Sequence, residues 1–304
     1  MPGTFIISLD CEGKWGMADK IGPEHDFITH RNLIVAYKTI VDAFALYGIK
    51  ATFAFVGAFT LTEAERARYL PHVVETPYRG TDWNAHFLEA KARGEMDGWF
   101  CPEALDIAQA AGHEIASHGF THVPFDDPQM PAATLDADLA AAVAVAKAKG
   151  YAIDTFVYPR NQVGHTDLLT KHGIGAYRTF LPSMNRIASL MREMNVMGTS
   201  QAHGLRDGEL VVIPAGYFLN WRQGLRKRVP KAVTVRRWQS ILKHAARHDG
   251  VAHLWLHPHN IISGPETMDV LSDILALVSR MRDTGKIVVQ TQVEYARRVQ
   301  PLQD

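Results

Sequence analysis

Two histidines four residues apart, His118 and His122, are the strongest sign of chemistry in this chain. A helix repeats every 3.6 residues, so on one helical turn both imidazoles face the same side and can reach one metal ion. A carboxylate from another part of the chain completes such a set and leaves positions for water and substrate. This pattern is typical of a hydrolytic metal site. The alternative is a pair of surface or core histidines with no ligand role.

A pair of acids, Asp10 and Glu12, offers the carboxylates. They follow the apolar run Phe5-Ile6-Ile7, which predicts a buried strand. Residues two apart in a strand point to the same side, so both carboxylates can enter one site. One of them would bind the metal, and the other would act as general base on water. The alternative is a strand-end turn in which the acids cap the next segment.

Two later motifs offer a proton donor and an anion-binding turn. His257 follows the apolar run Leu254-Trp255-Leu256 and can protonate a leaving nitrogen, unless it is a buried strand-end histidine. Arg160 lies in Tyr158-Pro159-Arg160-Asn161, where its side chain can pair with a carboxylate. The N–H groups after the proline can donate to an oxyanion. An ordinary turn with an exposed arginine is the alternative for that segment.

Apolar runs of β-type composition alternate with helical patterns, which predicts βαβ units, an α/β fold and a parallel sheet. The predicted strands cover Phe5–Leu9, Ala51–Val56, Glu114–Ser117, Thr155–Tyr158, Ala176–Arg178, Leu210–Ile213, His253–Leu256 and Ile287–Gln290. The predicted helices cover Asn32–Leu46, Ala104–Ala111, Leu135–Lys149, Asp167–His172 and Val270–Asp283. Because the candidate residues follow strands, we expect them to meet at the carboxyl ends of the sheet. We expect one domain over residues 1–304, with insertions at Gly57–Gly98 and Leu181–Leu210.

The composition argues against several classes of protein. The 32 lysines and arginines balance 32 aspartates and glutamates, so no overall charge favours nucleic acid or a membrane. A hydrophobic content of 47% is enough for a core and excludes extended disorder. No apolar run reaches the ~20 residues of a membrane-spanning helix, and the start lacks a secretory pattern, so we expect a cytoplasmic protein. Cys11 and Cys101 are expected to be free thiols.

A basic stretch, Arg222–Arg237, follows the aromatic residues Tyr217, Phe218 and Trp221. One interpretation is a surface for an anionic glycan, a nucleotide diphosphate or phospholipid head groups. The other interpretation is a solvated loop and helix start. A similar choice, between stacking on sugar rings and packing in the core, applies to four tryptophans. These are Trp15, Trp83, Trp99 and Trp255.

In their order along the chain, these motifs resemble those of the polysaccharide deacetylase family, the NodB-homology carbohydrate esterases. The acidic motif comes first, then the run Ala51-Thr52-Phe53, then His118–His122, then a Pro-containing motif, and last Leu256-His257. The likeness extends from about Phe5 to Val293 and leaves out the two insertions. It implies a distorted (β/α)7-type barrel that holds a divalent metal, usually zinc, and removes acetyl groups from N-acetylated sugars.

Carried over by position, the resemblance makes Asp10 the catalytic base and His257 the catalytic acid. The metal ligands are then Glu12, His118 and His122. Zinc is the expected ion, and Co²⁺, Mn²⁺ or Ni²⁺ are other ions that such ligands bind.

Three positions depart from the family pattern. The common acidic motif has two adjacent aspartates, and here the second is Cys11. Some relatives place the metal-binding acid one residue later, where Glu12 stands, and a Cys11 thiolate is the alternative ligand. The family often has an arginine at the position of Val157 that orients the base, and we expect Arg160 to take this role. Its backbone N–H is expected to help hold the oxyanion. The family's Asp-x-x-Asp-Trp motif has no clear match.

The resemblance implies a substrate that is an acylated amino sugar, with an acetyl or a formyl group to remove. A bacterial surface glycan such as O-antigen or capsule, or its nucleotide- or lipid-linked precursor, fits a cytoplasmic protein, with peripheral membrane contact for the lipid-linked case. The alternatives are a cyclic-amide hydrolase of the allantoinase type and a non-catalytic carbohydrate-binding or assembly protein on the same scaffold. The sequence does not indicate an oligomeric state.

Overall fold

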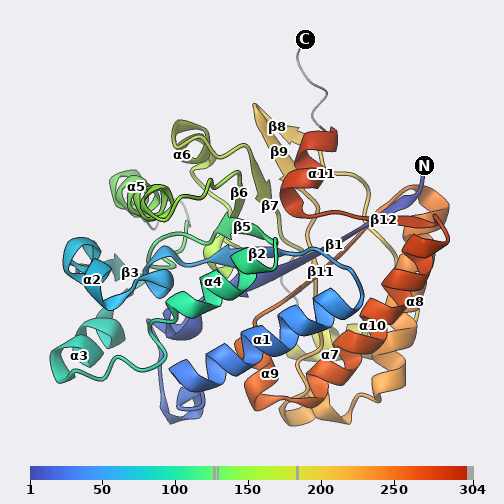
Figure 1. Cartoon of the computed structure of the whole chain (residues 1–304), viewed down its shortest axis with the longest axis horizontal. Coiled ribbons are helices and arrows are strands. Elements are labelled where there is room, and N and C mark those ends of the chain that lie inside the picture. The colour runs from blue at the N-terminus through green and yellow to red at the C-terminus, as the bar shows by residue number, and fades with distance from the viewer. Residues whose placement is uncertain (126–127, 129, 183–184, 300–304) are drawn as a thin grey trace.

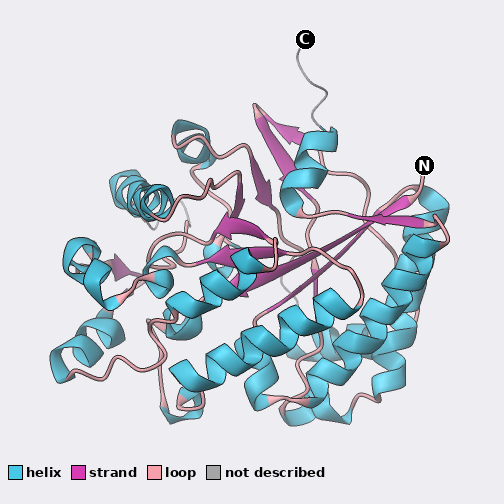
Figure 2. Ribbon diagram, in the orientation of Figure 1, coloured by secondary structure: helices cyan, strands magenta, loops and turns pink. Residues whose placement is uncertain are grey.

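Short runs rich in valine, isoleucine and phenylalanine form one ten-stranded sheet in the computed structural model, which describes residues 1–125, 128, 130–182 and 185–299 (Figure 2). Its strands are β1 (Gly3–Cys11), β2 (Thr52–Phe55), β5 (Glu114–Ser117), β6 (Thr155–Val157), β7 (Ala176–Arg178), β8 (Arg206–Asp207), β9 (Leu210–Ile213), β10 (Tyr217–Phe218), β11 (Val251–Leu256) and β12 (Ile287–Val289). A separate hairpin joins β3 (Pro77–Tyr78) and β4 (Thr81–Asp82).

The strand order is β10-β11-β1-β2-β5-β6-β7-β9-β8, with β12 added beside β1. Every pair in this sheet is parallel except β8 against β9. The sheet curls, but within the described residues its edge strands β10 and β8 do not pair with each other, so the barrel stays half open (Figure 1). The predicted α/β fold with a curled parallel sheet is confirmed.

Helices surround the sheet on its outer side (Figure 2). Those between the strands are α1 (His30–Leu46), α4 (Pro102–Ala110), α5 (Ala132–Ala148), α6 (Thr166–Lys171), α8 (Lys231–His248), α9 (His259–Ser263) and α10 (Glu266–Asp283), and α11 (Gln292–Val299) follows the last strand. The predicted insertions contain α2 (Glu63–Tyr69), α3 (Ala85–Arg93) and α7 (Arg186–Met194), while residues 183 and 184 lie outside the described chain. None of the described helices combines the length and apolar character needed to cross a membrane.

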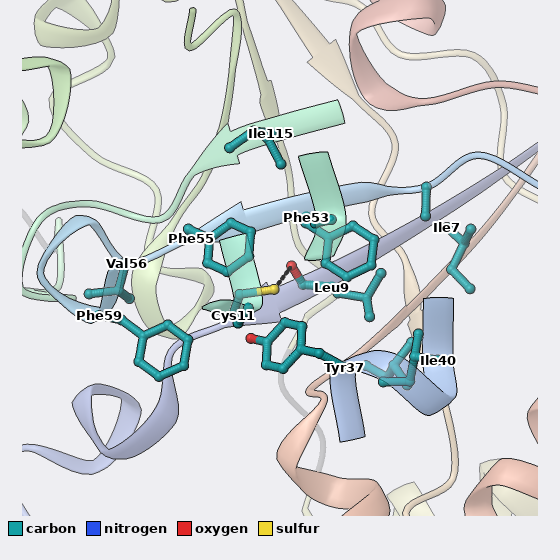
Figure 3. Close-up of a cluster of buried hydrophobic side chains, with 14 of the residues drawn as sticks. Ile7, Leu9, Cys11, Tyr37, Ile40, Phe53, Phe55, Val56, Phe59 and Ile115 are labelled. Atoms are coloured by element: carbon teal, nitrogen blue, oxygen red, sulfur yellow. Dashed lines mark hydrogen bonds between the residues drawn. The ribbon is translucent and has the colours of Figure 1, made fainter. Parts of the chain in front are cut away.

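Strand β1 explains how one segment serves both the core and the site. Its side chains alternate, and Ile7, Leu9 and Cys11 face Tyr37 of α1 in a buried apolar cluster (Figure 3). Asp10, on the opposite face of the strand, points into the interior of the half-barrel. The sheet is paired on both sides of β1, by β11 and by β2, which fixes this register.

The predicted elements agree with the structure where the apolar pattern is local and strong. Three strands, Glu114–Ser117, Ala176–Arg178 and Leu210–Ile213, have the predicted bounds. Helix α8 is not predicted from the sequence, because its many arginines, lysines and histidines obscure an apolar stripe. That stripe consists of Trp238, Ile241, Leu242 and Ala245 and is buried.

Candidate active site

The carboxyl ends of β1, β5, β6, β10 and β11 open into one cleft with a volume of about 390 Å³. Parallel α/β folds gather functional groups at this edge because each strand delivers its next residues there. The lining includes Asp10, Glu12, His118, His122, Arg160, Asn161, Phe218, Trp221, Trp255, His257, His259 and Asn260. All six residues proposed from the sequence for the site therefore border the same cleft.

Three of these residues converge on one point. Glu12 Oε2 lies 3.0 Å from His122 Nε2 and 3.4 Å from His118 Nε2, and the two imidazole nitrogens are 3.0 Å apart. All three side chains are buried. A carboxylate oxygen and two imidazole nitrogens in this arrangement are the donors of a three-residue metal site with open positions for other ligands.

The segment that carries the two histidines is a loop, so the predicted helical turn from 118 to 122 is wrong. Gly119 and His122 both have positive φ, of 77° and 62°, which a helix does not allow. The loop is shaped instead by Asp138 of α5, whose carboxylate accepts bonds from the backbone N–H groups of Phe120 and Thr121 and from the Thr121 hydroxyl. A contact from a distant helix, rather than helical periodicity, brings the imidazoles together.

The chemistry of the donor set fits a divalent cation. His118 Nδ1 lies 2.6 Å from the carbonyl oxygen of Val157, which can only accept, so this nitrogen carries the proton and leaves the Nε2 lone pair facing Glu12. Burial lowers the pKa of His122 to about 4, so this ring is neutral at pH 7. Its Nδ1 is buried and has no hydrogen-bond partner among the described residues. Lone pairs directed at one another favour a shared cation between them.

The second oxygen of Glu12 faces His257 on the other side of the carboxylate. His257 Nε2 lies 3.4 Å from Glu12 Oε1, and the side-chain nitrogen of Asn260 lies 3.4 Å from His257 Nδ1. The ring of His259 stacks beside that of His257 with centroids 5.0 Å apart. His257 is partly exposed to the cleft, so its imidazole is open to a bound molecule.

Asp10 makes a two-pronged salt bridge with an arginine that the sequence analysis did not select. The guanidinium of Arg178, at the end of β7, donates to both carboxylate oxygens of Asp10 at 2.7 and 2.8 Å. Burial raises the pKa of Asp10, but the charge and the hydrogen bonds of Arg178 lower it by more, so the net shift is downward and Asp10 is ionised at neutral pH. The same guanidinium also donates to Ser8 and to Asn161.

The position of Arg178 corrects the role expected of Arg160. Val157, where the family pattern often has an arginine, is the register partner of Arg178 on the neighbouring strand. Val157 packs in the interior with Ala54 and Ala116, two small residues that leave room for a large side chain nearby. The arginine that holds Asp10 therefore comes from the next strand, and the side chain of Arg160 does not contact Asp10.

Arg160 lies on the wall of the cleft instead. Its guanidinium pairs with Asp19 and lies 4.7 Å from the ring centre of Trp83. Arg160 and Asn161 both have positive φ, of 55° and 54°, an uncommon conformation for residues other than glycine. In this turn the N–H groups of Asn161 and Gln162 donate backbone hydrogen bonds. Within the described residues, the N–H of Arg160 donates none.

Cys11 cannot serve as the alternative ligand in this structure. Its thiol points into the helix-facing core, beside Tyr37 and 3.5 Å from the carbonyl oxygen of Leu9 (Figure 3). Burial raises its pKa well above the ordinary value, so the thiol is protonated. A second thiol, Cys101, stands near His30 and Glu103 at the starts of α4 and α1, and burial raises its pKa to about 12.

The four tryptophans have different environments. Trp15, Trp83 and Trp99 are buried in the core, whereas Trp255 borders the cleft.

In the basic stretch Arg222 is buried and donates to two backbone carbonyls and to Glu266. Salt bridges also neutralise other charges of this stretch, pairing Arg226 with Glu193, Lys227 with Glu266, and Lys231 with Asp269.

Three functional candidates were not predicted from the sequence: Arg178, Asp138 and His259. Arg178 had a detectable signal, because it is a charged residue at the end of a buried apolar strand. His259 follows His257 by two residues and was visible as part of a His-Pro-His motif. The role of Asp138 depends on a contact between α5 and a loop, for which the local sequence gives no signal.

Comparison with known proteins gives one match to a family model and several matches to solved structures. Residues 34–176 match the family model of polysaccharide deacetylase, a segment that includes His118 and His122. The resemblance expected from the motifs is confirmed for residues 34–176. Asp10, Glu12 and His257 lie outside the matched segment. No curated protein matches the chain in sequence.

Three solved structures have the same fold. A protein from Mycobacterium smegmatis described as a polysaccharide deacetylase has a TM-score of 0.62 at 17% identity, covering 97% of this chain and 89% of its own. A protein from Pseudomonas aeruginosa PAO1 with the same description has a TM-score of 0.58 at 12% identity, covering 99% and 92%. The Puue allantoinase has a TM-score of 0.57 at 13% identity, covering 97% and 89%. At these identities the likeness concerns the fold.

Proposed function

We propose that this chain is a metal-dependent hydrolase that removes an N-acyl group from an amino sugar. One observation carries the proposal: the Glu12 carboxylate faces His118 and His122 with one oxygen and His257 with the other. Two residues before it, Asp10 is held by Arg178. A ligand set, a base and an acid around one cleft are the parts that amide hydrolysis needs.

Glu12, His118 and His122 would hold the cation, with zinc as the proposed ion because its preferred ligands are imidazole and carboxylate in sets of three. Cobalt, manganese and nickel also bind such donors. A divalent cation at these ligands supplies Lewis acidity, which lowers the pKa of water and polarises an amide carbonyl. The hydrogen bond from His118 to Val157 fixes the ring for this role.

Asp10 is the proposed general base. Its carboxylate accepts the proton of the attacking water, and the two bonds from Arg178 keep the carboxylate ionised and fix its direction. A base with a lowered pKa is weak in bulk water. It would suffice in this cleft with a cation held by Glu12, His118 and His122, which would make the attacking water more acidic.

His257 is the proposed general acid. It borders the cleft opposite the two histidine ligands and would give its proton to the amine nitrogen as the C–N bond breaks. Arg160 is proposed to donate to the oxyanion through its backbone N–H, which makes no hydrogen bond within the described residues, and to act through a guanidinium at the cleft wall.

The cleft supports a sugar as substrate. Phe218, Trp221 and Trp255 give it an aromatic wall on which a pyranose ring can pack. The volume of about 390 Å³ is in the range of small-molecule sites. We propose an N-acetyl or N-formyl amino sugar of a bacterial surface glycan or of its nucleotide- or lipid-linked precursor.

The test is release of acetate or formate from a panel of N-acyl amino sugars by the zinc-loaded protein. We expect turnover in the wild type and loss of turnover in Asp10→Asn and His257→Ala, with metal content unchanged in both variants. Ring opening of allantoin without acyl release would favour a cyclic-amide hydrolase, a reaction named for one protein with this fold. Sugar binding without turnover of any substrate would favour a non-catalytic role.

A further inference from the structure

Helix α7 presents its apolar side to solvent. Ile187, Met191 and Met194 follow the i, i+4, i+7 spacing of one helix face, and their exposed fractions are 74%, 68% and 52%. Met197, just after the helix, is 78% exposed. A surface helix of a globular protein normally turns such a face inward, so this orientation needs an external partner.

The side of α7 that faces the protein is polar. Glu193 is buried there and pairs at 3.0 Å with Arg226, which also donates to Ser189. Burial of a carboxylate is unfavourable unless it is paired, whereas burial of methionine and isoleucine is favourable. The polar side of α7 thus contacts the rest of the protein. Its isoleucine and methionine side chains, whose burial would be most favourable in free energy, remain exposed to water.

A basic segment lies beside this helix. Arg226 belongs to the short 3-10 helix η6 (Gly224–Arg228), whose Leu225 is 65% exposed. Lys227 and Arg228 are exposed next to it, and Arg228 has no acidic partner in the described part of the chain. Apolar side chains with cations at their border match an anionic phospholipid interface, where the apolar groups enter the acyl boundary and the cations meet phosphates.

We propose that the α7–η6 surface, formed by Ile187, Met191, Met194, Leu225 and Arg228, binds the surface of an anionic phospholipid membrane. A second copy of the chain is a poorer occupant, because self-association would bring the same cations face to face. None of the described helices is suited to crossing a membrane, so the contact is peripheral. The proposal does not depend on the catalytic assignment.

The α7–η6 surface lies next to the cleft, so membrane binding there would place the active site near lipid-linked molecules. A second cavity of about 250 Å³ is lined by Ser189 and Arg192 of α7 and by Phe180, which is partly exposed. It shares Phe218 and Trp255 with the main cleft. A membrane bound to the outer side of α7 would therefore lie beside the entrance through which a lipid-linked substrate reaches the site.

The experiment is sedimentation of the full chain with vesicles of phosphatidylcholine alone or mixed with phosphatidylglycerol. We expect binding to the mixed vesicles that weakens with added salt, and little binding to phosphatidylcholine alone. Met191→Glu should weaken binding by roughly tenfold or more. It removes one apolar side chain that would enter the membrane, and it adds a charge that anionic lipids repel. Val74→Glu is the matched control, because Val74 is 59% exposed and lies three residues before β3, which Figure 1 shows well apart from α7.

Three results would overturn the proposal. The first is recovery of the wild type unbound from the mixed vesicles, and the second is equal binding of Met191→Glu and Val74→Glu to them. The third is a light-scattering result in which the wild type is a dimer that Met191→Glu converts to a monomer, which would mean that a second copy covers the face. Thermal unfolding of both variants at the wild-type temperature verifies that the fold is intact.

Discussion

Val157 and Arg178 are register partners on β6 and β7, and the guanidinium that holds Asp10 comes from the second of them. An arginine at position 157 on β6 and Arg178 on β7 would have neighbouring backbone positions at the same edge of the sheet. Their side chains can therefore reach the same carboxylate. The arginine that holds the proposed base therefore stands one strand away from the position at which the resemblance led us to expect it.

The first prediction concerns this exchange. Arg178→Ala should lower kcat by roughly 100-fold, the scale of a general base, because Asp10 loses both bonds that direct it. The double variant Arg178→Ala with Val157→Arg should recover part of that loss. Arg160→Ala is the comparison, and we expect a smaller effect on kcat because its guanidinium pairs with Asp19.

The measurement is kcat on an N-acyl amino sugar, with circular dichroism to verify folding. Removing Arg178 leaves the buried Asp10 carboxylate unpaired, which destabilises the fold, so unfolding in urea should be recorded for each variant. A double variant no more active than Arg178→Ala, with an intact fold, would argue against the exchange.

The second prediction concerns the support of the histidine loop. Asp138→Ala should weaken metal binding by about 10- to 100-fold, because the carboxylate that holds Phe120 and Thr121 is lost. Asp136→Ala on the same helix is the matched control, since Asp136 pairs with Lys171 at the surface. Competition with a chromogenic chelator measures both affinities, and equal values would exclude Asp138 from positioning the loop.

The third prediction separates the ligands from the neighbouring thiol. His118→Ala and His122→Ala should each lose bound metal, while Cys11→Ala should keep about one ion per chain because Cys11 faces the core. Cys11→Ala should lower the free energy of unfolding by about 1 kcal/mol, since it opens a small void. Elemental analysis of the three proteins checks this, and a metal-free Cys11→Ala protein with a native fold would contradict it.

The fourth prediction is a pH dependence of stability. Burial and then the charge of Arg178 lower the pKa of His253 to about 3, while the nearby Asp10 carboxylate opposes this shift. In the unfolded chain the group titrates near 6.5, so below that pH the unfolded state binds a proton that the folded state does not. Stability should therefore fall with decreasing pH from about 6.5 toward about 3, by about 1.4 kcal/mol per pH unit for this group.

Unfolding in urea at a series of pH values between 7 and 5 measures this slope. His253→Gln should have a shallower slope by about one proton, whatever its stability at pH 7. His253 lies against Ser8 and the carbonyl of Pro214, away from the proposed metal ligands, so the metal does not obscure the result. Equal slopes in the two proteins would show that His253 is protonated in the folded state.

Local sequence predicted the strands and the ends of the strands well, because apolar β-type runs and their following polar residues are short-range signals. This was enough to bring Asp10, Glu12, His118 and His257 to one edge of the sheet. The conformation of the histidine loop was not predictable, since it depends on Asp138, 16 residues beyond His122 in sequence.

The partner of Asp10 was not predictable for a similar reason. Arg178 and Asp10 are 168 residues apart, and only the order of the strands brings them together. The nearer candidate, Arg160, was an interpretation from motif position, and the structure directs its side chain to Asp19 instead.

The alternation of side chains along β1 makes the chemistry of this protein sensitive to the length of a single strand. If one residue were inserted early in β1, the thiol of Cys11 would turn into the half-barrel and a carboxylate would turn toward the phenol of Tyr37. Such an insertion would abolish both the ion's carboxylate ligand and the proton acceptor at once. Loops elsewhere around the cleft can change in length without loss of these two carboxylates. Changes in substrate specificity are therefore expected in those loops and not in the first eleven residues.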